Sequence, residues 1–425
     1  MRKFLLWTGI VVAGIAAILL GINAYFVRRN GARLESRLAE LLAAGDPIAL
    51  KDLARPPIPP ETNAATFLRR AQNDLEAIQK ELSAIFPESG LPAGPLQPAE
   101  QEKLQKLFDA YPNLMPLLEQ AAACPDYDPQ LDYTIPAQAF LGRRLDALQK
   151  HRIAARVLRA RASLLLASGR ADDALAAIVL LLKLCRHFDG EPMIIGGLVA
   201  IACRGVAVEG ANVVLQSGPV GKEAREALER ELDRYDAVQL HIRMLKTERA
   251  LGLDMFRAMP WATSWLGRAF NDAGQLSYLD AIREYEQATS RPYYDVKPFE
   301  PVARNRTLFT PPHVALIELL RPALDAARTA METSRATVRC LRVLNAIQQK
   351  ADPDGKEPPK LSDLGLPPEV TTDPFDGQPL RVKRLPQGWL IYSVGPNRID
   401  DGGVLDNKTD VGLAPPGYDR KGGKT

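Results

Sequence analysis

The stretch from Phe4 to Val27 reads FLLWTGIVVAGIAAILLGINAYFV and contains no charged residue. As an α-helix that rises about 1.5 Å per residue it would be about 36 Å long, which exceeds a bilayer hydrocarbon core of about 30 Å. Trp7 and Tyr25 lie near its two ends, where interfacial aromatic residues are common, and the pair Arg28–Arg29 ends it. The stretch therefore predicts a single helix that spans a lipid bilayer.

A cleaved signal peptide is the alternative for this segment, because the chain starts Met-Arg-Lys. The apolar core of a signal peptide is normally about 7–15 residues long and is followed by small residues at a cleavage site. This run is longer, and Ile22-Asn23-Ala24 is a poor cleavage site. We therefore expect an uncleaved anchor.

Composition narrows the function classes. The 425 residues hold 54 Lys+Arg against 51 Asp+Glu, a net charge of +3, and the arginines are spread along the chain. The sequence therefore lacks the clustered basic residues that are typical of a nucleic-acid-binding face. Four cysteines without a C-x-x-C pair exclude a disulfide-built scaffold and a Cys-rich zinc site. Cys185 and Cys203 fall in apolar segments. They are expected either to be buried free thiols or to form a disulfide between adjacent helices.

Apolar periodicity predicts helices over most of the chain after the anchor. The clearest pattern is a narrow seam with spacings of four and three, made by Ala64, Leu68, Ala71, Leu75, Ile78, Leu82 and Ile85. This seam either packs inside its own bundle or binds a partner helix. Further helices are expected at residues 30–44, 99–110, 114–123, 136–166, 171–182, 193–215, 222–259, 276–289 and 336–350.

Three details of this helical body are informative. Residues 162–175 (ASLLLASGRADDAL) resemble a tetratricopeptide-like helical hairpin, although the markers of that repeat are missing. The run from Ala174 to Leu182 is apolar on every face, which predicts burial. Trp261 and Trp265 are expected in a turn that caps the bundle. Neither inner apolar run can span a membrane, since a charged residue interrupts each.

Specific reaction machinery is missing from the sequence. No G-x-S-x-G elbow, P-loop, dinucleotide-binding glycine pattern or H-E-x-x-H motif occurs. The four histidines are scattered; His241 and Glu248, seven residues apart, could share a helix face as a solvated or capping pair. An enzyme built from residues distant in sequence would escape this search.

From Arg335 onward the pattern changes to a helix followed by short strands at residues 380–383 and 389–393. The segment resembles the globular part of the major pseudopilin of type II secretion systems. The resemblance rests on Asp373-Pro374-Phe375 with Gly377 and Pro379, on residues 391–395 (IYSVG), on Gly402-Gly403, and on Asp410-Val411. The N-terminus lacks the prepilin-peptidase signature, so the likeness is confined to this segment.

That resemblance implies a calcium site in the acidic loop, with Asn397, Asp400 and Asp410 as the ligands. Oxygen ligands on a loop suit a hard cation such as calcium. An ordinary solvated acidic turn is the alternative. The combination of anchor, helical body and sheet resembles single-anchor envelope proteins of bacteria, whose body lies outside the cytoplasm.

The expected fold is mainly α: an N-terminal transmembrane helix, an α-helical bundle or hairpin-repeat body, and a small C-terminal α+β module with a short antiparallel sheet. The expected divisions are an anchor (1–29), a juxtamembrane helix and Pro-rich linker (30–60), a helical body (61–312), a pseudopilin-like helix and sheet (313–412), and a disordered tail (413–425). A position in the inner membrane with a periplasmic body is expected.

The expected function is a non-catalytic envelope scaffold or protein-interaction protein, bound to the bilayer through Phe4–Val27 and to protein partners, without nucleic acid. The alternatives are an accessory part of a type II secretion or pilus-like machine, and a membrane-tethered hydrolase. A tight cluster of ionisable side chains in a deep pocket would favour the hydrolase, and an open apolar groove would favour the scaffold.

Overall fold

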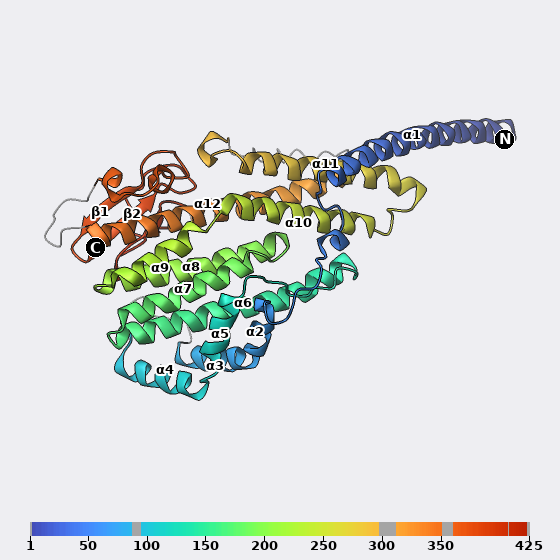
Figure 1. The fold of residues 1–425 in the computed structure, drawn as a ribbon. Helices are drawn as coiled ribbons and strands as arrows, with labels where there is room; N and C mark the ends of the chain where they lie inside the picture. Colours follow the sequence, from blue (N-terminus) through green and yellow to red (C-terminus); the bar gives the residue numbers. More distant parts are fainter. Residues whose placement is uncertain (1, 87–94, 297–311, 351–359, 407, 423–425) are drawn as a thin grey trace.

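The computed structural model describes residues 2–86, 95–296, 312–350, 360–406 and 408–422. A long helix projects from a helical body, and a small antiparallel sheet lies at the opposite end of that body (Figure 1). The α-helices are α1 (Arg2–Ala43), α2 (Ala64–Arg70), α3 (Gln72–Ile85), α4 (Pro98–Ala110), α5 (Leu114–Ala123), α6 (Ala137–Ala167), α7 (Ala171–Phe188), α8 (Met193–Ser217), α9 (Lys222–Asp233), α10 (Ala237–Arg257), α11 (Trp265–Thr289), α12 (Pro312–Lys350) and α13 (Pro368–Thr371). The mainly α fold class is confirmed.

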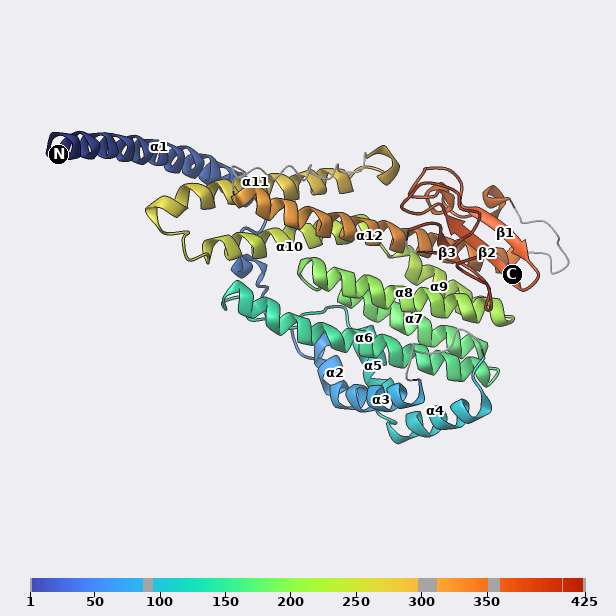
Figure 2. The same cartoon turned by 180° about the vertical axis from the view of Figure 1, so that it is seen from behind.

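Helix α1 joins the anchor to the expected helix at residues 30–44 without a break. Its most apolar stretch has no buried residue, whereas Leu34, nearer its C-terminal end, is buried in the body and Leu38 packs beside it. Helix α11 lies alongside this second half of α1 (Figure 2). Among the described residues, α8 is the other helix long and apolar enough to cross a membrane, but 67% of its apolar window is buried in the protein.

The seam of apolar residues packs inside its own chain. Ala71, Leu75, Ile78 and Leu82 are buried against helices α4 and α6, which settles the choice against a partner helix. The single expected helix is broken at Ala71, where α2 ends and α3 begins. Asn63 starts α2, because its side chain accepts a hydrogen bond from the N–H of Ala65 at 3.0 Å.

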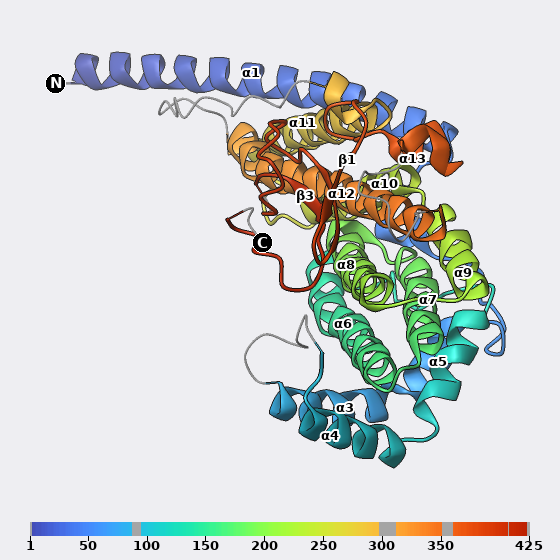
Figure 3. The same cartoon turned by 90° about the vertical axis from the view of Figure 1, so that its left-hand side faces the viewer.

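Helices α6, α7 and α8 form the centre of the body, and α3 and α4 cover α6 on the outer side (Figure 3). The turn between α6 and α7 uses Gly169 with φ 75°, a left-handed conformation that favours glycine. The apolar run of α7 is buried on most faces, but Ala176 is exposed and Leu180 is half-buried. The prediction of burial on every face is therefore wrong at these two positions.

The expected helical segment 222–259 is two helices, because Asp236 starts α10 by accepting hydrogen bonds from the N–H groups of Val238 and Gln239, each at 3.0 Å. Trp261 lies in the turn after α10, and Trp265 begins α11. Both indoles are about half exposed, at 52% and 46%, so they do not cap the bundle core.

Helix α12 belongs to two apolar clusters. Leu324 and Met331 lie with α1, α10 and α11 in one cluster, whereas Leu341 and Ile347 lie in the larger cluster with α2–α9. The helix that the sequence assigns to the C-terminal module thus lies deep in the helical body. Residues 290–312 and 87–98 are rich in proline, which predicts loops there, and most of each segment lies outside the described residues.

Three strands form one antiparallel sheet in the order β1-β2-β3. They are β1 (Arg381–Leu385), β2 (Gly388–Ser393) and β3 (Val411–Leu413), with Val382 opposite Ile391 and Tyr392 opposite Gly412. The two predicted strands are confirmed, and β3 was not predicted. The sheet packs on α12 and is tied to α8 through Gln216.

The described chain beyond β3, as far as residue 422, packs against α8 in the region where the sequence leads us to expect a disordered tail. Ala414 is 2% exposed, and its carbonyl oxygen accepts a hydrogen bond from Asn212 of α8 at 2.9 Å. Arg420 pairs with Glu209 of α8 at 2.8 Å. These contacts offset the entropy cost of ordering the segment. All four cysteines are free and buried, so Cys185 and Cys203 are not paired.

Candidate functional site

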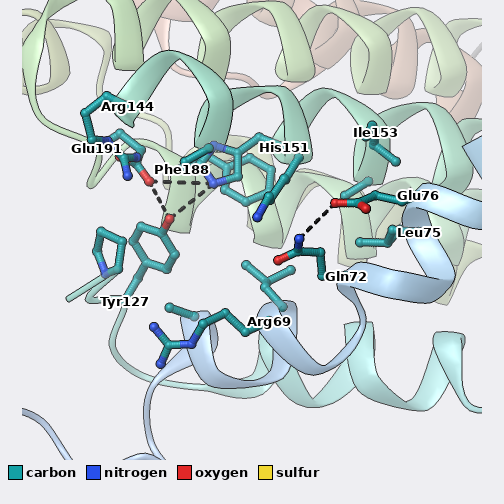
Figure 4. A pocket seen from close by; sticks show the side chains of 16 residues that line it. Arg69, Gln72, Leu75, Glu76, Tyr127, Arg144, His151, Ile153, Phe188 and Glu191 are labelled. Atoms are coloured by element: carbon teal, nitrogen blue, oxygen red, sulfur yellow. Dashed lines mark hydrogen bonds and ion pairs between the residues drawn. The ribbon is translucent and has the colours of Figure 1, made fainter. Parts of the chain in front are cut away.

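A cavity of about 200 Å³ lies between α2, α3, α6 and the loop around Tyr127. Figure 4 shows the side chains that line it. Leu68 and Leu75 come from α2 and α3, whereas Ile153 comes from α6. The walls are thus mainly apolar, and the buried polar groups collect at one end.

This buried polar end is organised around Glu191, in the short turn between α7 and α8. Its side chain is fully buried and forms an ion pair with Arg144 of α6, which is 5% exposed. Tyr127 donates a hydrogen bond to the other carboxylate oxygen. Burial raises the pKa of Glu191, and Arg144 and Tyr127 offset part of this effect. The Tyr127 pKa is raised well above its usual value by burial and by the Glu191 charge.

His151 completes the cluster. Its ring stacks on Phe188 with 3.9 Å between ring centroids and 15° between planes. Burial and the charge of Arg144 lower its pKa to about 3, so the imidazole is neutral. Because Tyr127 already donates to Glu191, its oxygen is free to accept from Nε2–H of His151, 3.1 Å away. Nδ1 then carries the lone pair, and in the described part of the chain it has no partner.

The mouth of the cavity carries polar side chains of both signs. Arg69 donates a hydrogen bond to the Gln130 side chain at 3.1 Å, and Gln72 donates one to Glu76 at 2.8 Å. Lys150 also lines the cavity. A ligand there would meet apolar walls, a mixed rim and a buried polar floor.

The acidic group of the cluster is already paired within the protein. Both oxygens of Glu191 are occupied, one by Arg144 and one by Tyr127. A general base works best with a pKa near the working pH, and an imidazole with a pKa of about 3 is a weak base at neutral pH. The arrangement therefore fixes the floor of the cavity more readily than it takes a proton.

A second concave region lies between α5, α7 and α9, with a volume of about 460 Å³. Its floor includes Ala176 and Leu180, the two positions of the apolar run in α7 that are not fully buried, and Ala224 and Ala227 of α9 line one side. We call this region the α7 groove. Charged side chains surround it: Glu119, Arg161, Arg170, Asp173 and Lys183.

The predicted calcium ligands lie in the loop between β2 and β3, where they hold turns together. Asp410 is fully buried, and its carboxylate accepts hydrogen bonds from the N–H of Asp401 at 3.2 Å and of Gly403 at 2.7 Å. Asp400 accepts hydrogen bonds from the Tyr392 hydroxyl at 3.1 Å and from the N–H of Gly402 at 3.0 Å.

Asn397 donates a hydrogen bond to Asp401 at 2.7 Å. Across the described residues, no group of three or more His, Cys, Asp or Glu side chains is placed to hold a metal ion. The structure assigns these side chains structural partners, and calcium binding stays a prediction.

Calcium binding predicts a rise in the melting temperature of the full chain in detergent. A cation that binds only the folded state should add about 2.7 kcal/mol at one hundred times its dissociation constant. The Asp410→Ala variant should lose this shift. Identical melting curves of the wild-type chain with millimolar calcium and with a chelator would contradict the prediction.

We expect His151 to make the free energy of unfolding fall as the pH is lowered. Its pKa is about 3 in the folded chain and 6.5 in its unperturbed state. As the pH falls below 6.5, the unfolded chain binds a proton that the folded chain does not, so stability is lost. The slope from this one group is about 1.4 kcal/mol per pH unit between roughly pH 6 and 4.

Urea unfolding of the wild-type chain and of His151→Gln at several pH values measures this contribution. The variant should lose stability less steeply on acidification, by about that slope. Equal slopes for the two proteins would show that His151 titrates normally.

His241 and Glu248 do not form the pair that their spacing allows. Nδ1 of His241 lies 3.1 Å from the Thr289 hydroxyl, whereas Glu248 accepts a hydrogen bond from the N–H of Ile194 at 3.1 Å. Sequence reasoning missed the Glu191 cluster, whose members lie in two helices, a loop and a turn. The one signal in the sequence for this cluster was the acidic residue Glu191 between two strongly apolar helices.

Comparison with known proteins adds nothing to this geometry: no family model, no curated protein and no solved structure matches the chain.

Proposed function

We propose that the chain is a membrane-anchored scaffold of the bacterial cell envelope that binds a protein partner through its helical body. Helix α1 provides the anchor, because its apolar stretch is long enough to cross a bilayer and none of it is buried in the protein. The resemblance of the C-terminal segment to pseudopilins supports a body outside the cytoplasm.

The α7 groove carries the proposal of partner binding. Ala176 and Leu180 continue the apolar run of α7, yet Ala176 is exposed and Leu180 is half-buried between α5 and α9. A volume of about 460 Å³ exceeds that of the Glu191 cavity. An apolar floor with charged walls suits an amphipathic helix of a partner, whose apolar face fills the floor.

A bulky charge in the groove tests this function. Ala176→Arg places a long cation on the apolar floor, and because Ala176 is exposed on a helix the fold should persist. Ala99→Arg is the matched control, since Ala99 is exposed on α4, outside the groove.

Tagged wild-type and variant chains are purified from membranes, and their bound proteins are compared. A partner that is recovered with wild type and Ala99→Arg and lost with Ala176→Arg supports the scaffold. Removing a central contact typically costs about 2 kcal/mol or more, about thirtyfold in affinity. Equal recovery with all three chains would contradict binding through the groove.

A membrane-tethered hydrolase is the second candidate, and the Glu191 cluster is the observation that favours it. Tyr127, His151 and Glu191 are ionisable groups in one cavity, with perturbed pKa values for all three. Hydrolysis of ester or amide substrates by wild type, and its loss in His151→Gln with an unchanged melting temperature, would favour this candidate over the scaffold.

A further inference from the structure

The turn between α10 and α11 has an unusual surface. Residues 258–267 (AMPWATSWLG) carry no charge and lie between Arg257 and Arg268. In this region Trp261 is 52% exposed, Trp265 46%, and Phe270 of the following turn of α11 54%. We call residues 258–270 the tryptophan tip. Exposed tryptophans on an uncharged turn are costly in water, because their apolar surface stays hydrated.

The tryptophan tip is bound to the apolar part of α1. Asn23, the one amide in the stretch from Phe4 to Val27, donates a hydrogen bond to the backbone carbonyl of Trp265 at 2.9 Å. Two turns further along α1 and one turn further along α11, Asn30 donates a hydrogen bond to the backbone carbonyl of Ala269 at 3.2 Å. The two helices therefore run side by side in the same direction, and the start of α11 lies level with Asn23.

This pairing fixes the depth of the tip. Asn23 lies four residues before Val27, so at about 1.5 Å per residue it is about 6 Å inside the end of the apolar run. Trp261 lies in the turn just before α11, beside Ser264, so it belongs to the same end of the body as Trp265. In Figures 1 and 2 the turn between α10 and α11 lies at the same end of the body as the projecting half of α1.

We propose that the tryptophan tip is a second membrane contact, inserted into the headgroup and upper acyl region of the bilayer that α1 spans. Tryptophan prefers this boundary, because its ring is apolar and its N–H is a donor. Arg28 and Arg29 on α1 and Arg268 on α11 are exposed near the same level, where lipid phosphates lie. The side chain of Asn23 has its partner within the protein, which lowers the cost of placing an amide there.

A second membrane contact would fix the orientation of the body, which the anchor helix alone does not. A single helix leaves the body free to rotate about its axis, whereas a tip beside that helix restricts the orientation of the body against the bilayer. The sheet lies at the far end of the body from the projecting half of α1, so it faces away from the membrane (Figure 2). This inference rests on the proposed bilayer insertion of α1, so the test must read both contacts separately.

The chain carries four tryptophans, which allows such a test with the full protein in lipid vesicles. Trp389 is 4% exposed and serves as a constant background. Trp7→Phe leaves the tip as the exposed reporter. The double variant Trp261→Phe and Trp265→Phe leaves Trp7 in the anchor. Lys103→Trp, made with all three other exposed tryptophans replaced by phenylalanine, is a control on α4, away from the membrane.

Emission is measured with lipids that carry a spin label near the headgroup and with iodide in the buffer. We expect the spin-labelled lipid to quench the fluorescence of the Trp7→Phe chain and iodide to have little effect on it. The fluorescence of the Lys103→Trp control should be quenched by iodide and not by the lipid. If iodide quenches the tip tryptophans and the spin-labelled lipid does not, the tip lies in water and the proposed membrane contact is wrong. A tip that serves as a protein-binding surface would give this result. If the spin-labelled lipid quenches Trp7 but not the tip tryptophans, α1 is inserted and the second membrane contact is wrong. If it quenches neither, α1 is not inserted either, and the proposed anchor is wrong as well.

Discussion

Replacing Arg144 with alanine should lower the free energy of unfolding by about 3–5 kcal/mol, because the change leaves a buried carboxylate without its counter-charge. The Glu191 side chain is fully buried, and Arg144 is 5% exposed. Tyr127 would remain as a hydrogen-bond donor, but it carries no charge. Urea unfolding of the detergent-solubilised chain measures the loss.

Arg143→Ala is the matched control, because Arg143 is the neighbouring residue on α6 and is exposed. Its effect should stay within about 0.5 kcal/mol. The double variant Arg144→Met and Glu191→Leu should recover most of the lost stability, since apolar residues of similar size can replace a buried ion pair at little cost. If Arg144→Ala unfolds at the same urea concentration as Arg143→Ala, the buried pair does not form.

Asp373→Ala should have an effect of similar size at the other end of the body. Asp373 is fully buried, and its carboxylate accepts hydrogen bonds from the N–H groups of Phe375 and Val394, each at 2.9 Å. The Ser393 hydroxyl donates to it at 2.6 Å, and Arg381 pairs with it at 2.7 Å. Removing one partner of a buried ion pair costs about 3–5 kcal/mol, and the backbone N–H groups of Phe375 and Val394 also lose their acceptor.

Glu369→Ala is the control for this site, because Glu369 is an exposed acid on α13. Thermal melting should separate the two variants clearly, with the loss confined to Asp373→Ala. A melting temperature of Asp373→Ala within one or two degrees of the control would contradict a central role for this carboxylate in holding the sheet.

The sequence predicted most of the fold, because helix periodicity and the anchor are local signals. The breaks were harder to predict. Ala71 ends α2 although the apolar seam continues through it, and Pro322 lies inside α12, where a helix end would be expected. In both places tertiary packing outweighs the local preference.

The candidate site was beyond the reach of sequence patterns for a physical reason. Tyr127 lies in a loop and Glu191 in a turn, 64 residues apart, and the fold of α6 and α7 brings them together. The acidic loop shows the opposite problem. Asp410 was predicted as a calcium ligand; in the structure its carboxylate accepts hydrogen bonds from backbone N–H groups, a role that composition does not distinguish from metal binding.

The central claim is that α1 crosses the membrane and holds the body outside the cytoplasm, and labelling of single cysteines tests it most directly. The four native cysteines are buried, so an added cysteine is the accessible thiol. Lys421→Cys marks the body and Lys3→Cys the N-terminal tail; Lys421 is exposed. With a thiol reagent that cannot cross the membrane, Lys421→Cys should be labelled in intact spheroplasts and Lys3→Cys only after lysis. Labelling of Lys421→Cys only after lysis would contradict the account.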